Sequence, residues 1–136
     1  MHFTLRFFGD VSESVIASVQ EVMSFWHPGT LEFSLSTVGS FGEKKSPSVF
    51  WLGGSFPEEI FEIALELGRI ADDKGRISTR RFVPHLTVAR RRRFSELPEL
   101  DPPDEIRGVF TKAAVINSEL TPEGPEYTFL KEYDLH

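Results

Sequence analysis

The first residues of the chain alternate between polar and apolar side chains. A period of two predicts a strand over residues 2–8, with the two kinds of side chain on opposite faces. The polar face would carry His2, Thr4 and Arg6, and the apolar face Phe3, Leu5 and Phe7. Gly9-Asp10 would end this strand.

Two later segments carry apolar side chains at the spacing of a helix. The first is expected to begin at a capping box formed by Asp10 and Glu13 and to run to about Trp26. The second would begin at Pro57 and end by Gly75. The predicted buried faces are Val15, Ile16, Val19, Val22, Met23 and Trp26 in the first helix, and Ile60, Phe61, Ala64, Leu67, Ile70 and Ala71 in the second.

The remaining apolar runs predict five more strands. They are expected at residues 31–38, at 49–52, around His85, at 108–117 and at 126–134. A polar turn at 42–47 and an acidic, proline-rich loop at 97–104 separate some of them. The order β-α-β-β-α-β-β-β, with short connections between neighbours, favours an α+β fold with antiparallel sheets.

Composition limits the class of protein. A chain of 136 residues with 40% hydrophobic and 26% charged residues predicts one globular domain over 1–136. The absence of cysteine excludes disulfides and thiolate metal sites, and it permits the reducing cytoplasm in which we expect the protein. No long apolar run and no basic-then-apolar start are present, so neither a membrane span nor a signal peptide is expected.

Charge is unevenly distributed along the chain. The net charge is −6, yet residues 69–93 hold eight arginines and one lysine against two aspartates, a local balance of +7. A local positive field attracts phosphate whatever the total charge. A solvated basic loop is an equally good interpretation of charge alone.

Two of the four histidines stand in the same short pattern. His2-Phe3-Thr4-Leu5 and His85-Leu86-Thr87-Val88 both read His-apolar-Thr-apolar. On a strand, each pattern presents one imidazole and one hydroxyl on the same face, above an apolar anchor. Facing pairs would suit a phosphodiester, because a neutral imidazole can take a proton from water while a protonated one gives a proton to the leaving oxygen. The threonine hydroxyls can donate hydrogen bonds to phosphate oxygens, and this chemistry requires no metal.

The same histidines are also compatible with a structural role or with a metal centre. A single histidine on a strand is more often structural or exposed than catalytic, but two copies in one apolar frame favour a site. A metal centre is the weaker alternative, because no third ligand stands at a suitable spacing beside them. We expect His27, at a helix end, and His136, at the C-terminus, to be exposed to solvent.

Four stretches carry a resemblance to a known family. They read HFTLRFFGDV, VGSFGEKKSPSVFWLGG, RRFVPHLTVARRRR and SELTPEGPEYTFL. Together they resemble the two-histidine (2H) phosphoesterase superfamily, and within it the RNA 2',3'-cyclic phosphodiesterases, also called 2'-5' RNA ligases. The resemblance covers residues 2–135. It implies a bilobal α+β fold in which two antiparallel sheets, flanked by helices, form a cleft.

The resemblance also implies roles for individual residues. His2 and His85 would be catalytic, and Thr4, Thr87 and Arg90 would contact the phosphate. Strict alternation puts Arg90 on the face opposite His85, so the strand is expected to end or bulge near Ala89. Residues that would line the substrate cleft are Phe8, Tyr127, Arg91 and Arg92, with Arg93 as a further contact to the RNA backbone.

The implied reaction is metal-independent hydrolysis of a 2',3'-cyclic phosphate at an RNA end to a 2'-phosphate, with no cofactor. The expected partners are RNA ends or small cyclic phosphates, and no membrane. Two alternatives remain open. One is a 2'-5' RNA ligase or a cyclic nucleotide phosphodiesterase built on the same residues. The other is a non-catalytic remnant that binds RNA ends.

The sequence departs from the family's pattern at its front. Family members carry a strand and a helix before the first histidine motif, whereas here only Met1 precedes His2. Their lack would leave an open sheet edge and exposed apolar surface. We therefore expect an N-terminally truncated fold: a fragment of a longer chain, a homodimer whose partner covers the gap, or local repacking.

Overall fold

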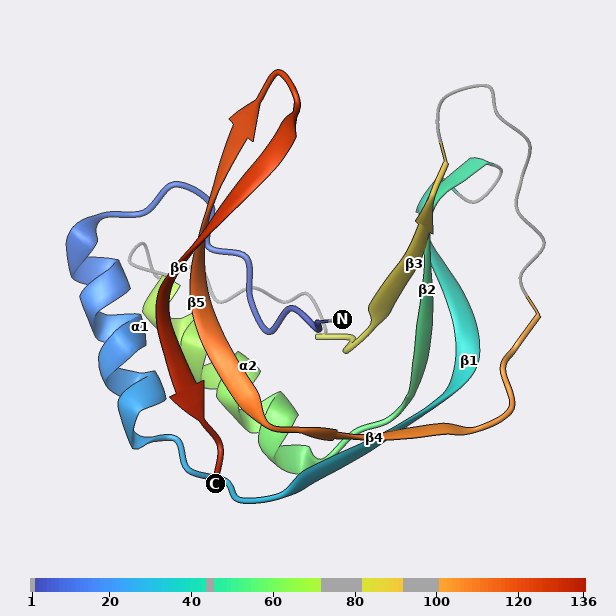
Figure 1. The fold of residues 1–136 in the computed structure, drawn as a ribbon, viewed down its shortest axis with the longest axis horizontal. Helices are drawn as coiled ribbons and strands as arrows, with labels where there is room; N and C mark the ends of the chain where they lie inside the picture. Colours follow the sequence, from blue (N-terminus) through green and yellow to red (C-terminus); the bar gives the residue numbers. More distant parts are fainter. Residues whose placement is uncertain (1, 44–45, 72–81, 92–100) are drawn as a thin grey trace.

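The computed structural model describes residues 2–43, 46–71, 82–91 and 101–136, and its described elements are two helices and six strands (Figure 1). In chain order they are α1 (Glu13–Phe25), β1 (Leu31–Glu43), β2 (Ser46–Ser55), α2 (Glu58–Ala71), β3 (Leu86–Arg90), β4 (Ile106–Phe110), β5 (Lys112–Thr121) and β6 (Gly124–Asp134). All strand pairs are antiparallel and form two sheets, β3-β2-β1-β4 and β5-β6. The predicted α+β class with two antiparallel sheets flanked by helices is confirmed.

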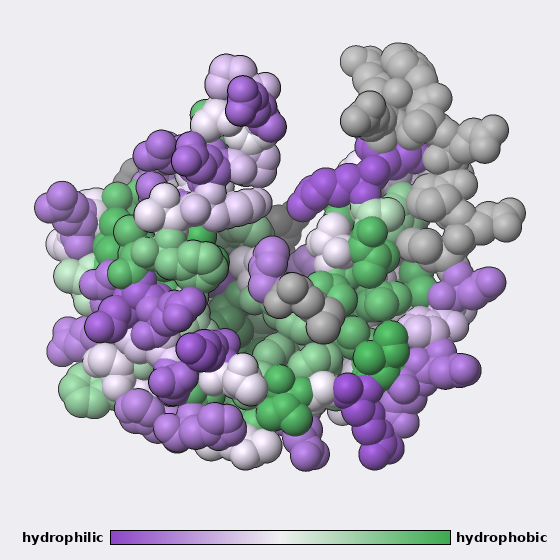
Figure 2. Space-filling model, viewed as in Figure 1, coloured by the Kyte–Doolittle hydropathy of each residue, from purple (hydrophilic) through white to green (hydrophobic). Residues whose placement is uncertain are grey.

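The two sheets stand as separate walls. In Figure 1 the β5–β6 hairpin lies on the left beside α1 and α2, while β1, β2 and β3 rise on the right. β4 closes the right-hand sheet at the bottom and leads into β5, and the N-terminal segment runs between the walls. The space-filling view shows the molecule hollowed between the tip of the β5–β6 hairpin and β3 (Figure 2).

The helices pack against the two-stranded sheet through one hydrophobic cluster. Its buried members are Val15, Val19, Met23, Ile63 and Leu67. Ala113, Val115 and Tyr133 of β5 and β6 pack against them, and so does Leu5. A second cluster contains Leu31, Ile60 and Leu135, and Leu5 contacts this one as well. The N-terminal segment is therefore tied to both clusters by one leucine.

The strand predicted over residues 2–8 is wrong. These residues have no regular secondary structure, and the chain bends at Leu5. Phe3 and Leu5 are partly buried as predicted, but Thr4 and Arg6 are partly buried as well. The predicted apolar face fails at Phe7, which is 81% exposed, while Phe8 packs against the core instead. A strand is stabilised by hydrogen bonds to a neighbouring strand, and no ladder joins this segment to another described strand.

The helices lie where they were predicted, with two corrections. Ser12, rather than Asp10, caps α1: its side-chain oxygen accepts a hydrogen bond from the backbone N–H of Val15. In α2 the buried residues are Ile60, Ile63, Ala64 and Leu67, the i, i+3, i+4, i+7 stripe. Phe61, predicted to be buried, lies beside this stripe and is 40% exposed.

The C-terminal strands are divided differently from the prediction. The run 108–117 is two strands, β4 and β5, which belong to different sheets and are separated at Thr111. Apolar alternation cannot reveal this division, because the pattern continues while the chain changes from one sheet to the other.

β1 is longer than predicted and pairs with β2 up to Glu43 and Ser46, so most of the predicted turn at 42–47 is strand. Residues 97–100 of the predicted acidic loop and Gly75 lie outside the described residues.

Neither described helix combines the length and the apolarity that a membrane crossing requires.

Candidate active site

The two His-x-Thr patterns meet at one cavity. This cavity, of about 170 Å³, is lined by His2, Thr4, His85, Leu86 and Thr87. The two pairs lie far apart in the sequence: His2 and Thr4 belong to the N-terminal segment, whereas His85 directly precedes β3 and Thr87 lies within it. The structure therefore brings together all four residues whose chemistry suits a phosphodiester.

An aromatic anchor positions His2 and Thr4 even though no strand holds them. The ring of Phe3, between them, lies 5.1 Å from Phe33, 5.2 Å from Phe110 and 5.6 Å from Phe56, measured between centroids. All three contacts are edge-to-face, a favourable arrangement for aromatic pairs. Burial of Phe3 directs its two polar neighbours toward the opposite side, where the cavity lies.

A hydrogen bond to the backbone orients His85. Its Nδ1 lies 2.8 Å from the carbonyl oxygen of Val83. A carbonyl can only accept, so Nδ1 carries the proton and donates it. The remaining nitrogen, Nε2, is then a lone-pair acceptor when the ring is neutral and a donor when the ring is protonated. One atom of His85 can thus serve as a base or as an acid toward a group in the cavity.

Two aromatic side chains flank the imidazole of His85. Phe41 of β1 contacts it edge-to-face at 4.9 Å, and Trp51 of β2 lies 5.8 Å away, between ring centroids. Phe41 and Trp51 also contact each other at 5.2 Å. The residue-level predictions missed both rings. Their only signal was that they stand within the stretch VGSFGEKKSPSVFWLGG, which carries part of the family resemblance.

A β-bulge places Arg90 on the face of Thr87. Thr87 pairs with Trp51, while Ala89 pairs with Phe50, the preceding residue of β2. Val88 is therefore an extra residue of β3. Cross-strand partners share a face, and the partners of Thr87 and Arg90 are two residues apart on β2. The bulge expected near Ala89 is confirmed. Arg90 itself is exposed and does not line the cavity in this structure.

The remaining predicted contacts lie elsewhere or outside the described part. Phe8 packs against the hydrophobic cluster of α1 and α2, not against the cavity. Tyr127 lies on β6 and is 60% exposed. Arg91 is half-buried beside β2, where its backbone N–H donates to the carbonyl of Ser48 at 2.8 Å. Arg92 and Arg93 fall outside the described residues, as does most of the basic segment 69–93.

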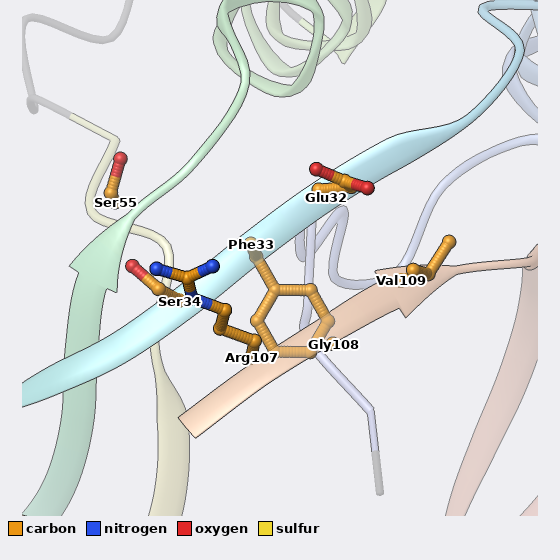
Figure 3. A pocket seen from close by; sticks show the side chains of 7 residues that line it. All are labelled: Glu32, Phe33, Ser34, Ser55, Arg107, Gly108 and Val109. Carbon is orange, nitrogen blue, oxygen red and sulfur yellow. The ribbon is translucent and has the colours of Figure 1, made fainter. Parts of the chain in front are cut away.

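A larger cavity of about 380 Å³ lies at the other end of the first sheet (Figure 3). It is lined by Glu32, Phe33, Ser34, Ser55, Arg107, Gly108 and Val109. The guanidinium of Arg107 lies beside Ser34 in Figure 3 and is 3.3 Å from the carboxylate of Glu105. With one arginine that is already paired and no imidazole, this cavity is the poorer candidate for an acid–base reaction.

Within the described ranges, no three His, Asp or Glu side chains come close enough together to hold a metal ion. His27 and His136 are exposed, as predicted.

Comparison with known proteins relates the chain to one group of enzymes. It is 31% identical over 140 residues to the RNA 2',3'-cyclic phosphodiesterase of Thermotoga maritima, covering 97% of this chain and 74% of that protein. It is 33% identical over 146 residues to the protein of the same name from Methanothermobacter thermautotrophicus, covering 99% of this chain and 78% of that protein. No family model matches the chain.

Solved structures with the same fold include E. coli LigT complexed with 3'-AMP. This neighbour has a TM-score of 0.78 at 27% identity, covering 98% of this chain and 76% of LigT. E. coli LigT in its apo form gives a TM-score of 0.76 at 26% identity over 98% of this chain and 74% of that one. The sequence comparison therefore relates the chain to RNA 2',3'-cyclic phosphodiesterases, and the structure comparison relates its fold to that of LigT.

Proposed function

Because the chain belongs to the RNA 2',3'-cyclic phosphodiesterase family, we propose that it hydrolyses a terminal 2',3'-cyclic phosphate of RNA to a 2'-phosphate. The observation that supports this most strongly is the cavity lined by His2, Thr4, His85 and Thr87. It offers the acid–base pair and the two hydroxyls that such a reaction needs.

The proposed reaction is an in-line displacement at phosphorus. A water oxygen forms a bond to phosphorus while the bond from phosphorus to the 3'-oxygen breaks. One neutral imidazole takes the proton of the attacking water, and the other, protonated, gives a proton to the departing 3'-oxygen. Thr4 and Thr87 would donate hydrogen bonds to the phosphoryl oxygens, and Arg90, on the same strand face as Thr87, would stabilise their negative charge. No step in this scheme uses a metal.

The roles of the two histidines are testable with a matched control. We expect His2→Ala and His85→Ala each to lower the rate of cyclic phosphate hydrolysis by at least about a hundredfold, because each removes a proton-transfer group. His27→Ala, at an exposed site after α1, should keep the wild-type rate. Circular dichroism checks that all three variants fold. Near-wild-type activity in either His2→Ala or His85→Ala would refute the proposal.

The substrate class needs its own comparison. RNA oligonucleotides ending in a 2',3'-cyclic phosphate are the proposed substrates, with small cyclic phosphates as poorer ones. Assays on a cyclic mononucleotide and on ligation to a 5'-hydroxyl RNA distinguish hydrolysis of RNA from the two related activities.

A cytoplasmic location and a homodimer that covers the expected N-terminal gap stay predictions. Light scattering of the purified protein tests the dimer.

A further inference from the structure

Trp51 lies flat against the sheet because two glycines make room for its ring. Gly39 pairs directly with Trp51, and a Cβ added there would come 2.2 Å from Cζ2 of the indole. A Cβ on Gly53, two residues along β2 on the same face, would come 2.8 Å from Cζ3. Real Cβ atoms essentially never approach so closely. Any side chain at Gly39 would therefore displace the indole.

The indole occupies this place next to His85. It stands directly opposite Thr87 in the ladder of β2 and β3, and its ring lies 5.8 Å from the imidazole at an interplanar angle of 53°. The ring of Phe41 makes a second aromatic contact with the imidazole, at an interplanar angle of 83°. The χ2 torsion of a histidine is broad and nearly two-fold, so an imidazole without such neighbours can turn over and exchange its two edges.

We propose that Trp51, seated over Gly39, is a positioning residue that holds the imidazole of His85 with Nδ1 on the carbonyl of Val83 and Nε2 toward the cavity. The inference concerns orientation and rests on the proposed function only for its effect on rate. Packing of the indole against the imidazole selects one of the two flipped orientations of His85. The hydrogen bond of 2.8 Å to the carbonyl of Val83 then fixes the tautomer in which Nδ1 carries the proton. A catalytic group held by packing in this way is preorganised, and misplacement by about 1 Å can cost about a hundredfold in rate.

The test uses two glycine-to-alanine substitutions that create the same kind of clash. Gly39→Ala displaces the indole of Trp51. Gly108→Ala is the matched control for the imidazole shifts alone, because a Cβ there would come 2.4 Å from the ring of Phe33, which contacts Phe3 and not His85. Neither glycine has a positive φ, so the backbone accepts alanine at both positions. Both variants should lose stability, but only the first changes the surroundings of His85.

The first measurement is the ¹⁵N chemical shift of both imidazole nitrogens of His85, assigned by comparison with His85→Ala. In the wild type and in Gly108→Ala we expect a protonated Nδ1 and an unprotonated Nε2 in the neutral ring. In Gly39→Ala the two shifts should move toward each other as tautomers and flipped states mix. The second measurement is kinetic: kcat of Gly39→Ala should fall by about tenfold or more, with KM within about threefold of the wild type.

A second substitution covers the case in which Gly39→Ala does not fold. Trp51→Phe keeps an aromatic ring and removes no hydrogen bond to the described residues, among which the indole N–H has no partner. Its shorter ring should give the same changes at His85, to a smaller extent. Wild-type shifts and wild-type kcat in either folded variant overturn the positioning role. If the wild-type protein hydrolyses no cyclic phosphate, the proposed function fails, and the imidazole shifts still decide the role of Trp51.

Discussion

Arg90 and Thr87 share one face of β3 although they are three residues apart, because Val88 is bulged out of the ladder with β2. In a regular strand an odd spacing puts two side chains on opposite faces. The extra residue reverses this and adds a cation to the face that presents the hydroxyl of Thr87. The proposed phosphate contact of Arg90 depends on this arrangement.

Removal of this cation should weaken phosphoester hydrolysis without unfolding the protein. Hydrogen bonds to charged groups contribute about 1.5–3 kcal/mol, so we expect Arg90→Ala to lower kcat/KM by about ten- to a hundredfold. Arg90→Lys should recover part of this, because lysine keeps the charge but loses the bidentate geometry. Steady-state kinetics on a cyclic phosphate substrate give both values.

The control for Arg90 is Arg107→Ala, which removes another exposed arginine of the same sheet, next to the larger cavity. It should keep wild-type kcat/KM. Equal losses in Arg90→Ala and Arg107→Ala would mean that general positive charge, not the position of Arg90, supports the reaction.

Chelation should leave the activity intact. In the proposed mechanism imidazoles transfer the protons, and Arg90 and the two threonine hydroxyls stabilise the negative charge of the phosphoryl group. We therefore expect dialysis against EDTA to change kcat by less than about twofold, in contrast to enzymes whose bound metal generates the nucleophile. A large loss that returns on addition of a divalent metal would contradict the proposed mechanism.

The burial of Tyr133 leads to a prediction of how the free energy of unfolding changes at alkaline pH. Burial raises the pKa of its hydroxyl above the usual 10.0, and the hydroxyl donates to the carbonyl of Gln20 in α1 at 3.3 Å. The raised pKa means that the unfolded state loses this proton first as pH increases. The contribution to the free energy of unfolding is therefore complete below about pH 10 and is lost as pH rises through the folded-state pKa.

Tyr133→Phe removes both effects. At neutral pH the variant should lose about 0.5–1.5 kcal/mol of the free energy of unfolding, the usual contribution of one hydrogen bond. From about pH 8 to about pH 11 its stability should decline less than that of the wild type, as measured by urea unfolding. Tyr127→Phe, at an exposed tyrosine of the same strand, should decline as the wild type does. Parallel curves for all three proteins would contradict this assignment.

Short sequence patterns were enough to indicate the family and the acid–base chemistry of the two His-x-Thr pairs. The positions of α1 and α2 follow from helical periodicity, because a helix makes its hydrogen bonds within one segment. The placement of Phe3 and Leu5 toward the interior also followed from alternation, since burial of apolar surface does not need a regular strand. Strand pairing could not be predicted in this way, because the run 108–117 keeps one apolar pattern across two strands that belong to different sheets.

The fold class, both helices and the two His-x-Thr patterns can be inferred from the amino-acid sequence, because they depend on local periodicity and on the chemistry of single residues. The shared cavity of the two patterns, the bulge at Val88 and the contact between Trp51 and His85 are visible only in the folded protein. Each of these depends on which residue stands opposite which on another segment. Such register is set by packing between distant parts of the chain, and no local pattern records it.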